Sequence, residues 1–419
     1  MNNATKTPWA TALLTSLLAS GCTDLGGGDT DGETASPTSG GDTSGPSDET
    51  GTPGDGTDNP GGTTGTSNDE SGDDDETGTG TGTPDLPSFD DAQDAVEVNY
   101  RDDLAAHVGC SAEGLAYTPA SIDGYPCAAK DYTDQEDTSK PIVLLVHGNS
   151  DTPDSWETFD PAGSCKTPLG GEGGEQLAEL LAANGFRTVA ADLRFDLVDD
   201  PNTNNDTENA ARNMDHGWAV PIAQSFIRTM MEENPDRRFV VVGFSLGATV
   251  TRDALRRLIV NEGFNPYPQI DHAFILAGPN HGVSSFPLCG TNPTMRGTVT
   301  CEMGNRAAYS PTYFTIPLNG PEGAYETPCS DGVNAFGHDV CEGHTLEWTT
   351  IVMEDLDGGE QQDLFVSQTS SALLGADNRT IGLNDFDTSN YFFCGLFRNH
   401  YGAARSTVAH GIIGEKLGF

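Results

Sequence analysis

The stretch Phe239–Val250, FVVVGFSLGATV, joins an apolar run to a Gly-x-Ser-x-Gly sequence. The run has the length and continuous apolarity of a buried parallel strand. The sequence LGATVTRDALRRLIV that follows the serine repeats apolar side chains at helical spacing. A strand that turns directly into a helix leaves no room for side chains two positions either side of the turning residue, which accounts for Gly243 and Gly247. We therefore expect Ser245 to adopt a strained backbone conformation with its hydroxyl exposed, as a nucleophile does at such a turn.

Strand and helix patterns alternate on both sides of this turn. Strands are expected at 141–148, 187–194, 239–244, 271–277, 347–355 and 378–383, and helices at 173–186, 218–235, 246–260 and 405–418. Strands that alternate with helices form βαβ units. The sequence therefore predicts an α/β fold with a mostly parallel central sheet flanked by helices.

The chain of 419 residues has a formal net charge of −44, from 64 acidic and 20 basic residues. This charge argues against nucleic acid as a partner, because the phosphates would be repelled. No Lys or Arg occurs between Lys6 and Arg101, and the intervening segment is rich in Gly, Thr, Ser and Asp. We expect residues 23–92 to form a disordered acidic tether and residues 93–419 to form the folded domain.

The N-terminus has the pattern of an export signal. Lys6 precedes the apolar stretch WATALLTSLLAS, which is of signal-peptide length and too short to span a membrane stably. The stretch ends in LASGC, which resembles the lipobox of bacterial lipoproteins. The resemblance implies that 1–22 is a lipoprotein signal peptide, that Cys22 is lipidated, and that the protein is anchored to the cell envelope, at the outer membrane or cell surface. An ordinary secretory signal followed by a free cysteine is the alternative.

Cys22 is one of nine cysteines, and an even number remains in an exported chain, which suggests disulfides. These are Cys110, Cys127, Cys165, Cys289, Cys301, Cys329, Cys341 and Cys394. We expect the local pairs 110–127, 289–301 and 329–341, which leaves 165 with 394. A zinc site is the alternative use, since His338 and His344 flank Cys341. No C-x-x-C spacing supports it, so no metal site is expected.

From about residue 141 onward the chain resembles secreted bacterial triacylglycerol lipases or esterases of the α/β-hydrolase superfamily. The stretches that carry the resemblance are VLLVHGNSDTPDSW (143–156), VVGFSLGA (241–248), LAGPNHG (276–282), DLFVSQTSSALLGADN (363–378) and NHYGAARS (399–406). It implies an α/β-hydrolase fold in which the nucleophile, the acid and the base follow in the order Ser, Asp or Glu, His. Insertions at 355–362 and 384–397 depart from the pattern.

A serine hydroxyl needs a base to take its proton and an acid to orient that base. Of the histidines that follow Ser245 (His272, His281, His338, His344, His400 and His410), His400 is placed in a loop between the last strand and the closing helix, as the base requires. The acid candidates after the strand 347–355 are Glu354, Asp355, Asp357, Glu360 and Asp363. We prefer Asp363, because apolar residues follow it at once and its spacing matches the family's acid segment. Asp355, nearer the strand end, is the second candidate.

Two backbone N–H groups are expected to stabilise the oxyanion. One belongs to Leu246, directly after the nucleophile, and the other to Asn149, in the loop after the strand 141–148. His147 is expected to brace that loop. The cysteine-rich stretch 283–345 lies where it could cover the site, and its role as a lid or as a surface excursion stays open.

These residues predict a surface-anchored serine carboxylic-ester hydrolase, a lipase or esterase that acts through an acyl-enzyme and needs no cofactor. Its partners would be an ester or lipid substrate and the membrane that holds its lipid anchor. The same triad would serve a polyester depolymerase, a feruloyl-type esterase or an acyltransferase. A non-catalytic binding protein on a hydrolase scaffold is the alternative of a different class.

Overall fold

A computed structural model describes the chain in the following ranges: 88–91, 118–122, 125–133, 135–148, 153–157, 176–193, 219–283, 315–320, 323–331, 339–356, 361–363, 365–382, 385 and 398–419. All of them belong to one compact unit, Gly80–Phe419. The predicted signal peptide and the predicted tether up to residue 87 lie outside these ranges. None of the helices in these ranges combines the length and the hydropathy that a membrane-spanning helix requires.

In these ranges eight strands form one sheet in the order β1-β2-β4-β3-β5-β6-β7-β8. They are β1 (Thr118–Ile122), β2 (Tyr125–Asp131), β3 (Ile142–Val146), β4 (Thr188–Ala191), β5 (Phe239–Phe244), β6 (Ile270–Leu276), β7 (Glu347–Met353) and β8 (Asp377–Ile381). All neighbours from β4 to β8 are parallel. The predicted mostly parallel sheet is thus confirmed. The antiparallel hairpin β1–β2, which extends the sheet beyond β4, was not predicted because its sequence has no apolar run.

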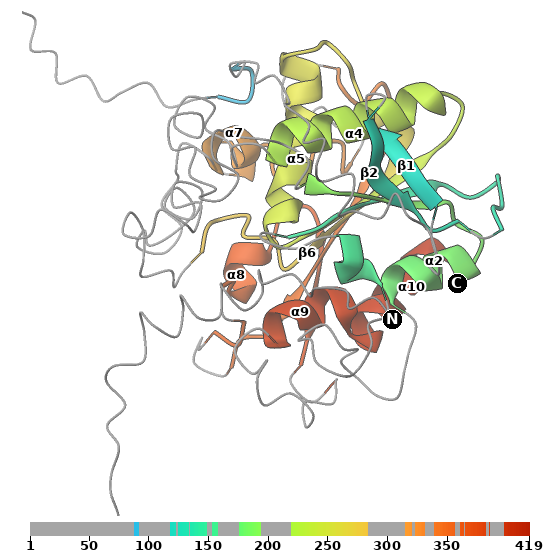
Figure 1. Cartoon of the computed structure of the whole chain (residues 1–419). Coiled ribbons are helices and arrows are strands. Elements are labelled where there is room, and N and C mark those ends of the chain that lie inside the picture. Colours follow the sequence, from blue (N-terminus) through green and yellow to red (C-terminus); the bar gives the residue numbers. More distant parts are fainter. Residues whose placement is uncertain are drawn as a thin grey trace, which may run out of the picture. The chain divides into compact units, whose positions relative to one another are not determined.

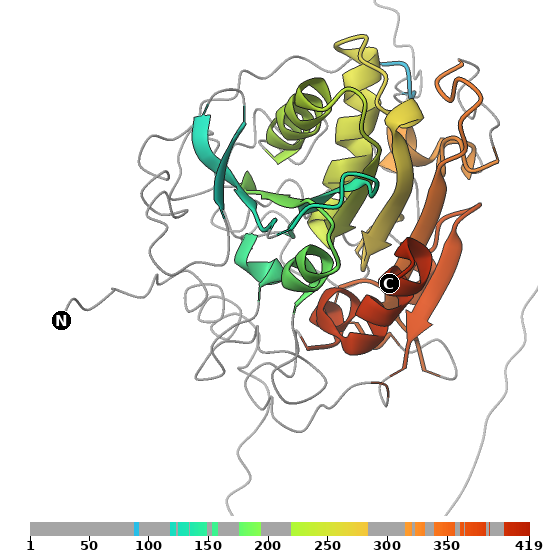
Figure 2. The same ribbon diagram turned by 90° about the vertical axis from the view of Figure 1, so that its right-hand side faces the viewer.

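Helices cover both faces of this sheet. They are α2 (Leu177–Ala183), α4 (Ala219–Glu233), α5 (Leu246–Val260), α7 (Thr315–Asn319), α8 (Gln368–Ser371), α9 (Arg398–Arg405) and α10 (Thr407–Leu417), with short 3-10 turns η2 (Pro153–Trp156) and η4 (Tyr267–Gln269). Figures 1 and 2 show α4 and α5 on one face and α2, α9 and α10 on the other. Along β3, Ile142 and Leu144 join the core cluster under α4 and α5, whereas Val143 and Leu145 join the opposite one. This alternation buries the strand on both faces, which explains its continuous apolar run.

The C-terminal region differs from the predicted loop and single helix. His400 lies inside a helix, α9, and the closing helix is a separate one, α10. The break falls at Ser406, whose extended backbone and side chain cap α10 by accepting the N–H of Ala409. A serine cap of this kind starts a new helix by satisfying one of its free N–H groups. The predicted helix 405–418 is thus confirmed as α10, and the element that the prediction missed is α9, since a loop was expected around His400.

Packing of the domain begins inside the stretch predicted as tether. Phe89 is 2% exposed, and its ring lies 5.6 Å from that of Tyr325. Arg256 on α5 donates to the carbonyls of Phe89 and Asp91 at 2.8 and 3.1 Å. One aromatic residue and one buried cation therefore attach residues 88–91 to the domain, although the composition around them is typical of a disordered segment.

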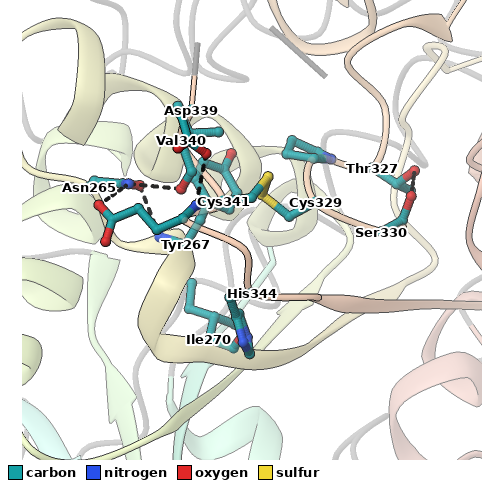
Figure 3. Close-up of a disulfide and its surroundings, with 12 residues drawn as sticks. Asn265, Tyr267, Ile270, Thr327, Cys329, Ser330, Asp339, Val340, Cys341 and His344 are labelled. Atoms are coloured by element: carbon teal, nitrogen blue, oxygen red, sulfur yellow. Dashed lines mark hydrogen bonds between the residues drawn. A yellow bond between two sulfur atoms is a disulfide. The ribbon is translucent and has the colours of Figure 1, made fainter. Parts of the chain in front are cut away.

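A disulfide joins Cys329 and Cys341, as predicted, with an S–S distance of 2.03 Å (Figure 3). Both cysteines are buried in the core cluster that lies against α5. Neighbouring bonds fix both ends of the bridged segment, since Trp348 Nε1 donates to Pro328 O and Asn265 Nδ2 to Val340 O. Each of the other predicted pairs, 110–127, 289–301 and 165–394, includes at least one cysteine outside the described residues, and the lipidation site Cys22 lies outside them as well.

Two buried histidines make the stability of the fold depend on pH. His272 in β6 stacks on Phe274 and contacts Thr349 Oγ1 at 2.9 Å, and burial lowers the pKa of its imidazole to about 4. His410 in α10 contacts Ala404 O at 3.1 Å, and burial lowers its pKa to about 4 as well. Unfolding releases both from this penalty.

We predict that the free energy of unfolding decreases as the pH falls from about 6.5 to about 4. In that window the two histidines bind protons in the unfolded state but stay largely neutral in the folded state. Each histidine therefore lowers the free energy of unfolding by about 2 kcal/mol between pH 7 and pH 5. His410→Gln should make this loss smaller than in the parent. Urea unfolding of both proteins at pH 7 and pH 5 measures it, and equal losses in the two proteins would contradict the prediction.

Candidate active site

The turn between β5 and α5 holds Ser245 in an unusual backbone conformation. Its φ is 55° and its ψ is −126°, a region that non-glycine residues rarely adopt. Such a residue costs about 1–3 kcal/mol and persists only where its surroundings impose it. Here the Ser245 N–H donates to Leu276 O at 2.8 Å, which ties the turn to β6. The strained conformation predicted from the sequence is present.

The two glycines of the motif are required by close backbone contacts. A Cβ on Gly243 would lie 2.6 Å from the Cα of Ala248. A Cβ on Gly247 would lie 2.5 Å from Val146 O and closer still to His147 O. The first turn of α5 therefore packs directly on the backbone at the end of β3, and any side chain at these positions would force the strand and helix apart.

Ser245, His400 and Asp363 lie in one hydrogen-bonded series. His400 Nε2 is 2.7 Å from Ser245 Oγ, and His400 Nδ1 is 2.8 and 3.0 Å from the two carboxylate oxygens of Asp363. A carboxylate only accepts, so Nδ1 carries the proton and donates it. Nε2 is then free to accept the Ser245 hydroxyl proton. Residues from three separate parts of the chain thus form an arrangement that can activate a serine.

The position of Asp363 is fixed by its own loop. Asp363 is 1% exposed, and its Oδ1 accepts the N–H groups of Phe365 and Val366 at 2.8 and 3.1 Å. Asn399, which precedes the histidine, donates its side-chain N–H to Gln362 O at 2.7 Å. The hydrogen bond between Asn399 and Gln362 therefore ties the residue before His400 to the residue before Asp363.

Asp355, the second candidate for the acid, lies elsewhere in the same loop. Its Oδ2 accepts the N–H of Gln368 at 3.1 Å. Its pKa is raised, chiefly by burial and further by the nearby charge of Asp363, against hydrogen bonds from the backbone of Gln362 and Gln368. The structure therefore places Asp363 on His400 Nδ1 and gives Asp355 contacts to the backbone on either side of Asp363.

The predicted oxyanion groups are described in part. Leu246 begins α5 directly after Ser245, and its N–H belongs to the first turn, where helix N–H groups have no partner inside the helix. Asn149 lies outside the described residues. The residue before it, Gly148, approaches Ser245 so closely that a Cβ there would be 3.0 Å from Ser245 Cβ.

His147 braces the start of that loop. Its Nε2 accepts the N–H of Leu193 at 3.0 Å. The proton therefore sits on Nδ1, which lies 2.9 Å from Gly148 O and donates to it. The imidazole thus links the end of β3 to the segment that follows β4, and both of its ring nitrogens are engaged in structural hydrogen bonds.

The remaining histidine candidates lie away from the series. His272 and His410 are buried in β6 and α10. His281 contacts Glu326 and His344 contacts Arg238, and His338 is outside the described residues. Among the residues that the structure describes, no cluster of three or more His, Cys, Asp or Glu side chains is arranged to hold a metal ion.

The sequence reading missed the aromatic rings around the base. Phe365 meets the His400 ring edge-on with centroids 5.0 Å apart, and Phe244 lies 5.1 Å away. Tyr401 follows at 6.3 Å. Each stands within two residues of a triad member, so adjacency in sequence is the signal that would have identified them. They enclose the imidazole in an apolar surrounding that strengthens its hydrogen bonds.

A family model supports the assignment of the fold. The model described as "Alpha/beta hydrolase family" matches residues 143–371, which is more than half of the chain. The chain belongs to the alpha/beta hydrolase family. The match runs from β3 to the end of α8 and includes both Ser245 and Asp363.

Several solved structures are similar to this hydrolase at low identity. A lipase from Bacillus licheniformis in its mature form is 16% identical, over 69% of this chain and 96% of that one, with a TM-score of 0.40. A carboxylesterase from Bacillus subtilis is 11% identical over 76% and 96%, with a TM-score of 0.32. Lipase B from Aspergillus fumigatus is 14% identical over 64% and 54%, with a TM-score of 0.36. No curated protein matches the sequence.

We predict that Gly247→Ala prevents this hydrolase from forming the elbow. The added methyl group would meet two backbone carbonyls, so we expect a loss of several kcal/mol in the free energy of unfolding, as for other overpacked backbone contacts. Gly411→Ala in α10 is the matched control, because a Cβ there has no atom within 4 Å. It should raise stability by about 0.5–1 kcal/mol, the usual gain of helix propensity. Urea unfolding measures both, and a Gly247→Ala protein as stable as the parent would refute the packing argument.

Proposed function

We propose that this alpha/beta hydrolase is a serine carboxylic-ester hydrolase, of the lipase or esterase kind, that acts through an acyl-enzyme. The observation that carries the proposal is the position of His400, with Nε2 at 2.7 Å from Ser245 Oγ and Nδ1 at 2.8 Å from Asp363. The lipase and esterase names of the similar structures agree with it. A non-catalytic binding protein would have no need to preserve three residues from distant parts of the chain in this arrangement.

The reaction follows from the proton positions. His400 Nε2 takes the hydroxyl proton as Ser245 Oγ attacks the ester carbonyl, and Asp363 stabilises the imidazolium that forms. The same proton then goes to the leaving alcohol as the C–O bond breaks. Water, deprotonated by His400, attacks the acyl-enzyme, and the acid is released as Ser245 recovers its proton. No cofactor takes part in these steps.

The tetrahedral intermediate carries a negative charge on the former carbonyl oxygen. The N–H of Leu246 is a donor for it at the positive end of the α5 dipole. We assign the second donor to Asn149, because its neighbour Gly148 lies against Ser245. Removing one such donor typically costs ~3–4 kcal/mol of transition-state stabilisation.

We also propose that the chain is exported and anchored at the cell envelope through a lipid on Cys22. The LASGC sequence supports the anchor. The Cys329–Cys341 disulfide is consistent with an oxidising compartment outside the cytoplasm. In this proposal the substrate is an external ester or lipid, and the strongly acidic chain does not bind nucleic acid.

We predict that the purified full chain hydrolyses p-nitrophenyl esters and that Ser245→Ala abolishes the turnover. Asp363→Asn should lower kcat by about 10⁴-fold, the loss typical when the acid that orients the base is removed. Asp355→Asn is the matched control, because Asp355 contacts backbone N–H groups and not His400. It should retain most of the turnover.

Comparing chain lengths from acetate to palmitate separates the candidate activities. A preference for long chains indicates a lipase, and a preference for short chains indicates an esterase. A folded parent protein that leaves every ester intact would contradict the proposal for these substrates and favour a polymer substrate, an acyl acceptor other than water, or a binding role. A large loss in Asp355→Asn and none in Asp363→Asn would reassign the acid.

We predict that Cys22→Ser moves the protein from the membrane fraction to the soluble fraction. Without the thiol there is no acceptor for the acyl chains, and no other anchor is proposed. Fractionation of cells that express either form measures the shift. A mature N-terminal peptide without an acyl mass would refute lipidation and leave the ordinary secretory signal.

A further inference from the structure

The segment that carries Asp363 is a short unit with caps at both ends. Asp363 accepts the N–H groups of Phe365 and Val366, and Ser367 caps the next short helix, α8, by accepting the N–H of Ser370. The carbonyls of Ser370 and Ser371, at the end of α8, have no partner inside the helix. Whatever binds those two carbonyls therefore fixes the far end of the acid segment.

The loop after β6 supplies these bonds. Asn280 Nδ2 donates to Ser371 O at 2.7 Å. His281 donates its backbone N–H to Ser370 O at 3.1 Å, and Ser370 Oγ in turn donates to Gly282 O. Asn280 is 0% exposed, so its amide makes its bonds inside the protein. The loop that follows the strand beside the nucleophile thus holds the end of the acid segment.

Arg252 orients Asn280 from the other side. Arg252 lies on α5 seven residues, or about two helical turns, after Ser245. It is 4% exposed. Its Nη1 donates to Asn280 Oδ1 at 3.2 Å. An amide whose oxygen faces a guanidinium must turn its N–H₂ away, here toward Ser371 O.

The cysteine-rich stretch completes the surroundings of Arg252. Arg252 Nη2 donates to Leu318 O, Asn319 Oδ1 and Glu326 O at 3.0, 2.9 and 3.2 Å. Asn319 Nδ2 donates to Asn280 O at 2.7 Å. Burial lowers the pKa of Arg252 to about 10, which leaves it cationic at neutral pH. Part of the stretch whose role the sequence left open therefore packs as a brace.

We propose that Asn280, held by Arg252, is a positioning residue that sets the acid segment of Asp363 relative to the helix that follows Ser245. The inference rests on the proposed serine hydrolase function. Asn280 touches no reacting atom in this assignment and acts only through the segment 363–371. Its removal should therefore lower the rate of the chemical step and leave substrate binding unchanged.

The test measures kcat and KM of the full chain with p-nitrophenyl butyrate. Asn280→Asp keeps the shape and the acceptor for Arg252 but loses the N–H that Ser371 O accepts, so it should fold. We expect kcat to fall about tenfold to a hundredfold, as for small displacements of catalytic groups, with KM unchanged. Asn280→Ala should lose kcat at least as strongly.

Asn265→Ala is the matched control (Figure 3). Asn265 also holds two loops through its amide, donating to Val340 O at 2.7 Å and accepting the N–H of Tyr267 at 3.3 Å. It should lower the thermal midpoint as the Asn280 variants do and keep the parent kcat. A fall in kcat of the same size in Asn265→Ala would show a general loss of structure and overturn the proposal.

A second arm introduces Asn280→Asp into Asp363→Asn. If Asn280 acts through Asp363, it lowers kcat no further in that background, whereas an independent structural role would lower kcat by the same factor in both. A folded Asn280→Asp protein with parent kcat also overturns the proposal. If turnover does not depend on Ser245, measured with Ser245→Ala, the proposed function fails and this proposal fails with it. If turnover depends on Ser245 but kcat is unchanged in the Asn280 variants, only the positioning role is refuted and the proposed function stands.

Discussion

The positive φ of Ser245 is the constraint on which the rest of the site depends. It forces β5 to end and α5 to begin around a single residue, so the hydroxyl and the first unpaired N–H of the helix belong to adjacent residues. This tight turn is possible only because Gly243 and Gly247 let the helix rest on the backbone of β3 and β5. The strain is stored locally and is balanced by the burial of both elements in the two core clusters.

Much of the fold could be predicted because the central strands are buried on both faces. β3, β5 and β6 are buried on both faces, so their apolar runs are continuous and their expected ranges agree closely with the structure. The elements that were missed obtain their stability from distant partners. The hairpin β1–β2 pairs with β4 at the edge of the sheet, and Phe89 packs on Arg256 and Tyr325 from a segment of polar composition. Local sequence patterns do not predict contacts between residues that are distant in the sequence.

The choice of the acid shows where local patterns stop being informative. Asp355 and Asp363 share one loop, and the order of the residues alone does not say which of them reaches the base. The structure distinguishes them by their bonds, because Asn399 on α9 holds Gln362 and thereby places Asp363 on His400. Asn399 and His400 both lie in the first turn of α9, and from there both side chains contact the loop of Gln362 and Asp363. The sequence predicted a loop at the position of α9.

The buried polar network around Arg252 is difficult to explain by stability alone. Burying a cation carries a large desolvation penalty, and well-packed apolar residues of similar volume are often at least as stabilising. Apolar packing, however, would not fix the orientation of a polar side chain, which directional hydrogen bonds do. Arg252 fixes the orientation of the Asn280 amide, and that amide has one productive partner, Ser371 O. The positioning role proposed for Asn280 would account for this network, because that role needs the segment of Asp363 at a constant position relative to α5, whereas stability alone would permit many other packings.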